Sequence, residues 1–229
     1  AQMVASRSYA LYLSAQGQSF TANSALCSGW TSSEVLQSRW GSDYAANMQR
    51  LQSLAARTGQ TVLLYNGQPA AACYHAISSG HTEASQNVWG GQLPYLCGVD
   101  SAWDKFADGY EVTIQYSAEQ VRTALEELGL TPDDSPESWV GASTWDKAGY
   151  VRTLELCGQM VSGLDVRKAL DLRSTCFAIA WRGGQFVITT RGYGHGVGLS
   201  QYGAKAMAEG GAGWEDLLGY YFPGTEIAS

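Results

Sequence analysis

Apolar residues that recur near a 3.6-residue period predict helices at several points along the chain. A capping box opens one of them, because Ser117 is followed three residues later by Gln120, and Gly129 comes after the last periodic residue. Asp43 and Ser200 are predicted as the N-caps of two others. The predicted helices span residues 1–13, 43–57, 117–128, 164–172, 201–209 and 214–222.

Shorter segments rich in β-branched and aromatic residues predict strands between these helices. Asn66-Gly67 tolerates positive φ at both residues and therefore predicts a hairpin, and Gly183-Gly184 predicts a second turn. The mixture predicts an α+β fold, in which short antiparallel strands accompany several helices. The predicted strands span residues 61–65, 70–77, 110–116, 151–156, 175–181 and 185–190.

Three segments without periodicity are predicted as loops or linkers. Residues 16–33 carry turn chemistry. Residues 78–101 are predicted as a long ordered loop or a short irregular subdomain, and loops of that length are usually functional when they are ordered. Residues 131–137, TPDDSPE, combine two prolines with three acids. We expect a single domain over residues 1–229, with two lobes around a groove as an option and a lobe boundary near 131–137.

Composition excludes several classes of protein. The net charge of −7 and the pI near 4.9 argue against a protein that binds a phosphate backbone. No run approaches the roughly 18 apolar residues of a membrane span, and a hydrophobic content of 45% argues against disorder. The first helix begins at Ala1 without an N-cap, from which we expect the natural chain to begin further upstream.

Residues 191–225 hold the most specific pattern, RGYGHGVGLSQYGAKAMAEGGAGWEDLLGYYFPGT. Glycine alternates with larger residues from 192 to 198, and in an extended chain this places the side chains on one face and bare backbone on the other. His195 lies between two glycines, so its ring is expected to be sterically open, either as a proton carrier or hydrogen-bond donor or as a structural histidine. The spacing is not that of a phosphate loop.

This stretch resembles the C-terminal signature of the stage II sporulation protein D family, which includes the amidase enhancer of the cell-wall amidase system. Upstream, AQMVASRSYAL resembles the AQAVAARTYA helix of the family. CYHAISSGHTEASQNVWGGQLPYLCGVDSAWD resembles its YHSTSGG-type segment with the VWG, PYL and VDSPWD pieces, and GLDVRKALDLRSTCFAI resembles its RxxLGLRSxxF segment. The four blocks occur in order and cover nearly the whole chain.

The resemblance implies a bacterial cell-envelope protein that acts on peptidoglycan glycan strands stripped of stem peptides. Sporulation members are lytic transglycosylases, which cut the MurNAc–GlcNAc bond without water, leave a 1,6-anhydro end and cooperate with an amidase during engulfment. The implied location is extracytoplasmic, with membrane contact only through an N-terminal anchor that this sequence lacks. No nucleic-acid partner is expected.

The resemblance places the catalytic glutamate upstream of the AQAVAARTYA helix, so no residue of this chain takes that role. Glu34, Glu83 and Glu155 do not match the family position. Glu83, in GHTEAS, is interpreted as a polar groove or loop residue.

Residues inside the matched motifs are the candidates for substrate binding. Arg7 is expected to pair with the upstream carboxylate or to hold an acetamido or lactyl group, with a solvated helix arginine as the alternative. For the others the alternative is a structural role, and for Ser200 that role is the helix N-cap. The candidates are Arg7, His75, Ser79, Thr82, His195, Ser200 and Gln201.

The five cysteines are an odd number without a CxxC pair, and they favour neither a disulfide framework nor a zinc cluster. Cys73, His75, His81 and Cys97 would supply two thiols and two imidazoles, and some clostridial family members bind zinc in this region. Their order matches no standard zinc spacing, so no cofactor is expected, with zinc at these four residues as a weak alternative. A Cys73–Cys97 disulfide is a further option.

Two classes of function remain open. One is a peptidoglycan lytic transglycosylase, and the other is a non-catalytic module that binds glycan and recruits a cell-wall amidase. The identity of the residues upstream of Ala1 distinguishes the two. A general carbohydrate-binding domain ranks last, because aromatic side chains more often form a core than a sugar platform.

Overall fold

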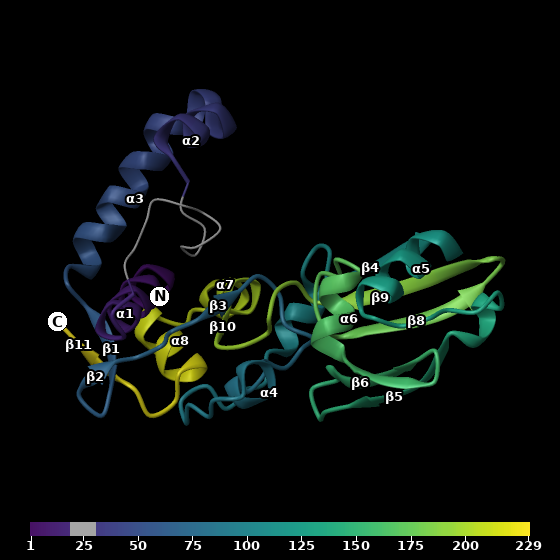
Figure 1. Ribbon diagram of the computed structural model, residues 1–229. Coiled ribbons are helices and arrows are strands. Elements are labelled where there is room, and N and C mark those ends of the chain that lie inside the picture. The colour runs from purple at the N-terminus through teal and green to yellow at the C-terminus, as the bar shows by residue number, and fades with distance from the viewer. Residues whose placement is uncertain (19–30) are drawn as a thin grey trace. The chain divides into compact units, whose positions relative to one another are not determined.

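The computed structural model describes residues 1–18 and 31–229 and shows an α+β protein (Figure 1). The chain divides into two compact units, which we describe separately. The first comprises residues 1–73 and 214–229, and the second comprises residues 74–213. The TPDDSPE segment at 131–137 lies inside the second unit and leads into a 3-10 turn, η3 (Pro136–Ser138).

In the first unit, helix α1 (Gln2–Ala15) packs on a small antiparallel sheet of order β11-β1-β2. The buried hydroxyl of Ser8 joins them, because it donates to the Val4 carbonyl at 2.7 Å and accepts from the Leu63 amide at 2.8 Å. The sheet consists of β1 (Val62–Tyr65), β2 (Gln68–Pro69) and β11 (Glu226–Ala228). Helices α2 (Ser33–Trp40), α3 (Tyr44–Thr58) and α8 (Trp214–Tyr221) and the turn η1 (Gly41–Asp43) complete the unit.

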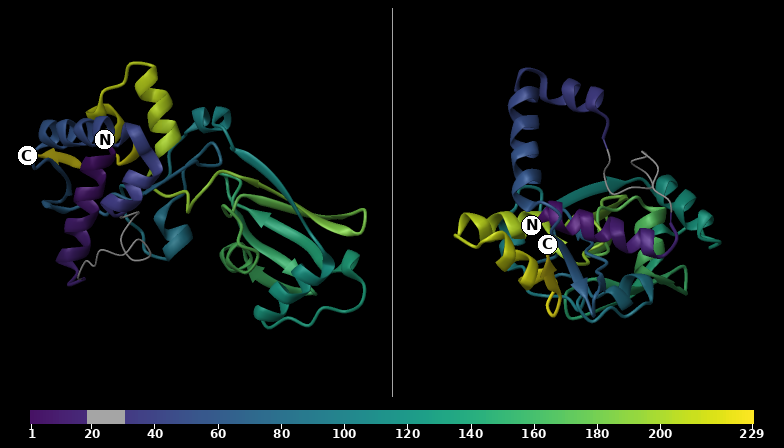
Figure 2. Two further views of the ribbon diagram at one scale, coloured as in Figure 1. Left: turned by 90° about the horizontal axis from the view of Figure 1, so that it is seen from above. Right: turned by 90° about the vertical axis from the view of Figure 1, so that its left-hand side faces the viewer.

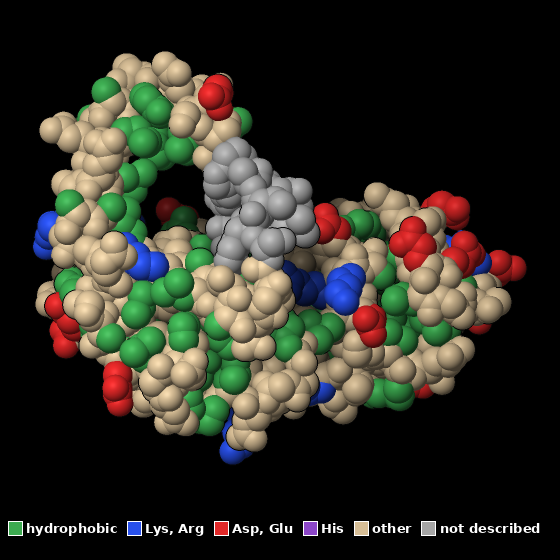
Figure 3. Space-filling model, turned by 60° about the vertical axis from the view of Figure 1, so that its left-hand side comes forward, with side chains coloured by type: hydrophobic (Ala, Val, Ile, Leu, Met, Phe, Trp, Pro, Cys, Tyr) green, Lys and Arg blue, Asp and Glu red, His purple; other side chains and the backbone are tan. Residues whose placement is uncertain are grey.

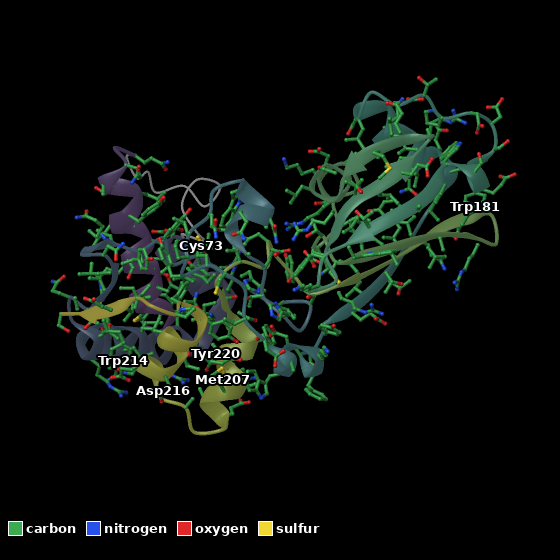
Figure 4. The ribbon with its side chains drawn as sticks, turned by 90° about the horizontal axis from the view of Figure 1, so that it is seen from below. Cys73, Trp181, Met207, Trp214, Asp216 and Tyr220 are labelled. Carbon is green, nitrogen blue, oxygen red and sulfur yellow. The ribbon has the colours of Figure 1, made fainter. Side chains whose placement is uncertain are left out.

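The predicted helices of this unit are confirmed, with two corrections. Asp43 precedes α3 but makes no side-chain cap, and helix α2 was missed although Ser32 caps it by accepting from the Val35 amide at 3.3 Å. Residues 19–30 of the predicted 16–33 loop, including Cys27, lie outside the described residues. Figure 4 labels Trp214, Asp216 and Tyr220, which lie on the predicted C-terminal helix α8.

The Asn66-Gly67 hairpin is also confirmed, since both residues have positive φ (51° and 72°) and β1 pairs with β2. Its second strand is β2 at Gln68–Pro69, before the predicted strand at 70–77, so the predicted position of that strand is wrong. The predicted strand continued to residue 77, but Tyr74 and His75 form a separate strand, β3, that pairs elsewhere.

The second unit contains two three-stranded antiparallel sheets of order β4-β9-β8 and β5-β6-β7. Helices α5 (Ala118–Glu127) and α6 (Gly163–Ala169) pack with them around one apolar core (Figures 1 and 2). Trp139 and Phe186 stack in that core, with ring centroids 5.7 Å apart, and Trp181 on β8 (Figure 4) packs on Phe186. The strands are β4 (Glu111–Tyr116), β5 (Val140–Trp145), β6 (Val151–Leu156), β7 (Gln159–Ser162), β8 (Phe177–Arg182) and β9 (Gln185–Arg191).

Two predictions from local sequence are confirmed in the second unit. The capping box of α5 is complete, because Ser117 accepts from the Gln120 amide at 3.2 Å and the Gln120 side chain accepts from the Ser117 amide at 2.9 Å. Gly183-Gly184 connects β8 to β9 with positive φ at both residues. Strands β5 and β7 were missed, although the strand between them was predicted.

The remaining part of the second unit is built from short elements. Strand β3 (Tyr74–His75) pairs in parallel with β10 (Leu199–Ser200), and helix α7 (Gln201–Glu209) follows β10. The predicted loop at 78–101 contains a short helix, α4 (Ser85–Trp89), and is followed by the 3-10 turn η2 (Ala102–Phe106), which packs on α7.

Acidic side chains occur at several separate places on the face drawn in Figure 3, as the negative net charge predicts. Among the described residues, no helix is long and apolar enough to cross a membrane.

Candidate functional site

Two of the recognised sequence blocks, far apart in the chain, meet within the second unit. His75 lies opposite Ser200 in the parallel pairing of β3 with β10. The amide of Ile77 donates to the Tyr193 carbonyl at 3.1 Å, and the reverse bond is 2.7 Å. The YHAISSGHTE and GYGHGVGLS segments therefore form one element.

The alternating glycines allow these two segments to approach closely, but they do not form an extended strand. Gly192, Gly194, Gly196 and Gly198 all have positive φ, between 74° and 112°, so the expected flat alternation is wrong. A Cβ at 194 would approach the His75 Cβ to 2.8 Å. Glycine is required at these positions both for the positive φ and for the close approach of the other block.

His75 is buried and carries one unsatisfied nitrogen. Its Nδ1 lies 3.1 Å from the Val197 carbonyl, which can only accept, so Nδ1 carries the proton. Nε2 is then a buried lone pair without a hydrogen-bond partner among the described residues. Burial lowers the pKa of His75 to about 4, so the ring is neutral near pH 7.

His195 is less open than the flanking glycines suggest. Its ring centroid lies 5.1 Å from that of Trp89 and 5.7 Å from that of His75. Its Nδ1 accepts from the Val197 amide at 3.1 Å, and the ring also has a hydrogen bond with the Tyr74 backbone. Burial, followed by the neighbouring His75 and Arg167, lowers the pKa of His195 to about 3. The expectation of a sterically open ring is therefore wrong, because partners from other segments pack on it.

The buried carboxylate of Asp104 connects the two blocks. One of its oxygens accepts from the Ser78 amide at 3.0 Å and from the Ser78 hydroxyl at 2.5 Å, and the other accepts from the Ser200 hydroxyl at 2.8 Å. Ser200 also accepts from the Gly203 amide at 3.3 Å, which confirms it as the N-cap of α7. Asp104 was not predicted as a site residue, although it is the final acid of the recognised VDSAWD segment.

Ser79 and Thr82 are buried and bonded to the backbone. The Ser79 hydroxyl donates to the Ala148 carbonyl at 2.7 Å, and the Thr82 hydroxyl accepts from the Val99 amide at 2.8 Å. Gln201 lies at the first turn of α7 and is half-buried. The second unit thus contains His75, Ser79, Thr82, His195, Ser200 and Gln201.

Arg7 belongs to the first unit, where it binds backbone. One guanidinium nitrogen donates to the Thr61 carbonyl at 2.6 Å, and another lies 3.5 Å from the Thr58 hydroxyl. Arg7 therefore connects α1 to the end of α3 and the start of β1 and is not simply a solvated helix arginine.

A second cluster, formed by Glu83, Asp146 and Arg152, lies in the second unit. The Arg152 guanidinium bonds both carboxylates and is 2.5 Å from Glu83 Oε2. The other Glu83 oxygen accepts from the Ala84 amide at 2.7 Å and from Asn87 at 2.8 Å. Burial, followed by the hydrogen bond with Asp146, raises the pKa of Glu83 to about 7, while that of Asp146 is lowered.

We expect Arg152→Ala to lower the free energy of unfolding by about 1–3 kcal/mol, because it leaves two acidic groups without their shared cation. The estimate is below the range for fully buried pairs, since the Arg152 side chain is 28% exposed. Denaturant unfolding at pH 7 measures the loss, with Arg182→Ala on the exposed end of β8 as the control. Equal stability of the two variants would contradict a structural role for the cluster.

Metal binding finds no support in the geometry of the described residues. Within them, no three His, Cys, Asp or Glu side chains gather closely enough to hold a metal ion. Cys73 and Cys97 are both free, so the optional disulfide between them is not formed. Cys73 is buried, and burial raises the pKa of its thiol to about 12.

Comparison with known proteins connects these motifs to a family. Over 200 residues, 87% of its length, the chain is 36% identical to stage II sporulation protein D of Bacillus subtilis, and it is equally similar to the protein of that name from Bacillus amyloliquefaciens. It is also 26% identical to the amidase enhancer of Bacillus subtilis, in an alignment that covers 76% of the chain and 32% of that protein. No family model matches the chain.

The chain spans 57% of the length of the two stage II sporulation proteins that it matches. Over the matched region it belongs to the stage II sporulation protein D family.

Proposed function

We propose that this chain is a lytic-transglycosylase-type domain that acts on denuded glycan strands of the bacterial cell wall. In this proposal the general-acid glutamate lies N-terminal to Ala1, and the chain supplies the surface that binds the glycan. It works outside the cytoplasm, together with a cell-wall amidase.

The observation that carries the proposal is the meeting of two of the four family blocks in one element. Asp104 bonds a serine of each block, and His75 and His195 lie side by side. A set of buried polar groups held this way is pre-organised, and pre-organised polar groups are typical of binding and catalytic sites. The half-exposed Trp89 indole beside His195 offers a flat apolar face next to it.

The chemistry suits the residues that the chain contains. Cleavage of a glycosidic bond requires an acid that protonates the leaving oxygen. When the 6-hydroxyl of the sugar itself attacks, no second carboxylate is needed to activate water. The two histidines would not supply a proton near pH 7, because burial lowers the pKa of each to below 5. In this proposal they hold the two blocks and the Trp89 indole in place.

The second candidate function is a non-catalytic glycan-binding enhancer of a cell-wall amidase. It is favoured by the likeness to the amidase enhancer and by the buried bonding of Ser79 and Thr82, which leaves their hydroxyl groups bound to backbone.

We expect the purified chain to sediment with sacculi that an amidase has stripped of stem peptides, and to bind untreated sacculi more weakly. The reason is that both candidate functions require recognition of the glycan itself. A pull-down on treated and untreated sacculi measures the difference, with serum albumin as a non-binding control. Equal binding to both preparations, or binding to neither, would contradict the proposed substrate.

A further inference from the structure

A cavity of about 840 Å³ lies within the second unit, at one end of the β4-β9-β8 sheet. Of the residues that line it, only Ser79 was predicted as a site residue. The wall combines aromatic and charged side chains, which is the usual composition of a small-ligand site. Its polar and aromatic lining includes Ser79, Lys105, Tyr110, Glu111, Trp145 and Arg191.

Lys105 is the uncompensated charge of this cavity. It forms no ion pair or hydrogen bond with any residue in the described part of the chain. The other cation, Arg191, is neutralised by Glu111, whose Oε2 lies 2.8 Å from the Arg191 Nε. In a chain of net charge −7, a local excess of positive charge attracts an anion to one place.

The backbone also fixes the path of the lysine side chain. Gly80 has a φ of 105°, and a Cβ at that position would collide with the methylene carbons of Lys105. The aliphatic part of Lys105 therefore lies directly against the Gly80 backbone. A side chain held along its stem loses less conformational entropy when its ammonium group binds a partner.

Trp145 supplies an apolar surface to the same cavity. It lies at the end of β5, opposite Val151, and is 57% exposed. A large exposed indole beside polar groups is typical of a surface that takes a ligand with one flat apolar face. The carbon–hydrogen faces of a pyranose ring meet that description.

We propose that this cavity binds a sugar that carries a carboxylate, with the carboxylate on Lys105 and the sugar ring on Trp145. The inference rests on the proposed function, under which the ligand is a muramoyl residue of the glycan strand. Its lactyl group ends in a free carboxylate only where the stem peptide has been removed, because the peptide is attached there as a neutral amide. The cavity would therefore favour stripped strands through charge.

The experiment measures the coupling between Lys105 and the lactyl carboxylate. The probes are a soluble oligosaccharide from denuded glycan and the same oligosaccharide with its carboxylates converted to primary amides. Isothermal titration calorimetry gives the dissociation constant of each probe for the unmodified chain, Lys105→Gln and Trp145→Ala. Lys147→Gln is the matched control, because it removes the same charge from an exposed residue outside the cavity lining.

We expect the unmodified chain and Lys147→Gln to bind the acid form about threefold to tenfold more tightly than the amide form. Lys105→Gln should bind both forms equally, and Lys105→Arg should keep the preference. Trp145→Ala should weaken the binding of both forms. Circular dichroism of each variant confirms that it is folded.

An unchanged preference in folded Lys105→Gln, or unchanged affinity in Trp145→Ala, would overturn the inference while leaving the proposed function intact, provided that the chain still sediments with stripped sacculi. Competition by sodium acetate at the concentration of the oligosaccharide would overturn the sugar assignment, since it would indicate a simple anion site. If the chain bound neither the oligosaccharides nor stripped sacculi, both the inference and the proposed function would fail.

Discussion

Under the proposed function, a chain that also includes the family segment N-terminal to the AQMVASRSYAL helix should release 1,6-anhydro ends from denuded sacculi about 10²–10⁴ times faster than residues 1–229 alone. The factor is the usual contribution of a positioned general acid. The family resemblance places that acid before the AQMVASRSYAL helix, and residues 1–23 contain no Asp or Glu. Chromatography of the soluble products, with detection of 1,6-anhydro ends, measures the rates.

The control is a form of the extended chain in which the glutamate of the added segment is changed to glutamine, and it should be as slow as residues 1–229. Equal activity of residues 1–229 and of the extended chain would place the acid within residues 1–229. Glu83→Gln would then be the first variant to make, because Glu83 is buried with a pKa raised to about 7. If both chains were inactive but bound glycan, the enhancer function would be favoured.

Features that depend on a few neighbouring residues were predictable from the sequence. The cap of α7 by Ser200, the capping box of α5 and the Asn66-Gly67 hairpin all follow from residues at most three apart, and the structure confirms each of them. The order of the β4-β9-β8 sheet was not predictable in this way. The sequence of each segment predicts a strand, but it does not indicate which distant strand pairs with it.

The candidate site was predicted less well, because its geometry comes from distant segments. The alternating glycines indicated a close approach of backbone but not the partner, which is the segment around His75. His195 looked open from its two glycine neighbours, whereas Trp89 and His75 pack on its ring. Asp104 connects two serines that are far apart in the chain, and no local pattern indicates such a role.

The buried hydrogen bonds also show which candidate residues have a structural role. Ser200 caps a helix, bonds Asp104 and lies in the parallel β3–β10 pairing, so its substitution would disturb folding and binding together. The side chains of Lys105 and Trp145 make no hydrogen bond or ion pair with the described residues, so variants at these two positions report on binding more directly.

Acid should destabilise the protein through its buried neutral histidines. The pKa of His75 is lowered to about 4 in the folded state, against about 6.5 in an unfolded chain. Below pH 6.5 the unfolded chain therefore binds a proton that the folded chain does not, and stability falls until the pH reaches about 4. His195, whose pKa is lowered to about 3, acts in the same direction. Glu83 acts in the opposite direction, because its raised pKa removes stability as the pH rises from about 4.5 to about 7.

A single variant isolates the histidine contribution from that of Glu83. His75→Asn retains a donor for the Val197 carbonyl but cannot titrate, and His81→Asn changes an exposed histidine as the control. Between pH 7 and pH 4.5, the free energy of unfolding of the unmodified protein should fall by about 2–3 kcal/mol more than that of His75→Asn. Urea unfolding at half-unit pH steps gives both curves. Parallel curves would mean that His75 binds a proton in the folded protein despite its burial, and that Nε2 has a partner able to stabilise the charged ring.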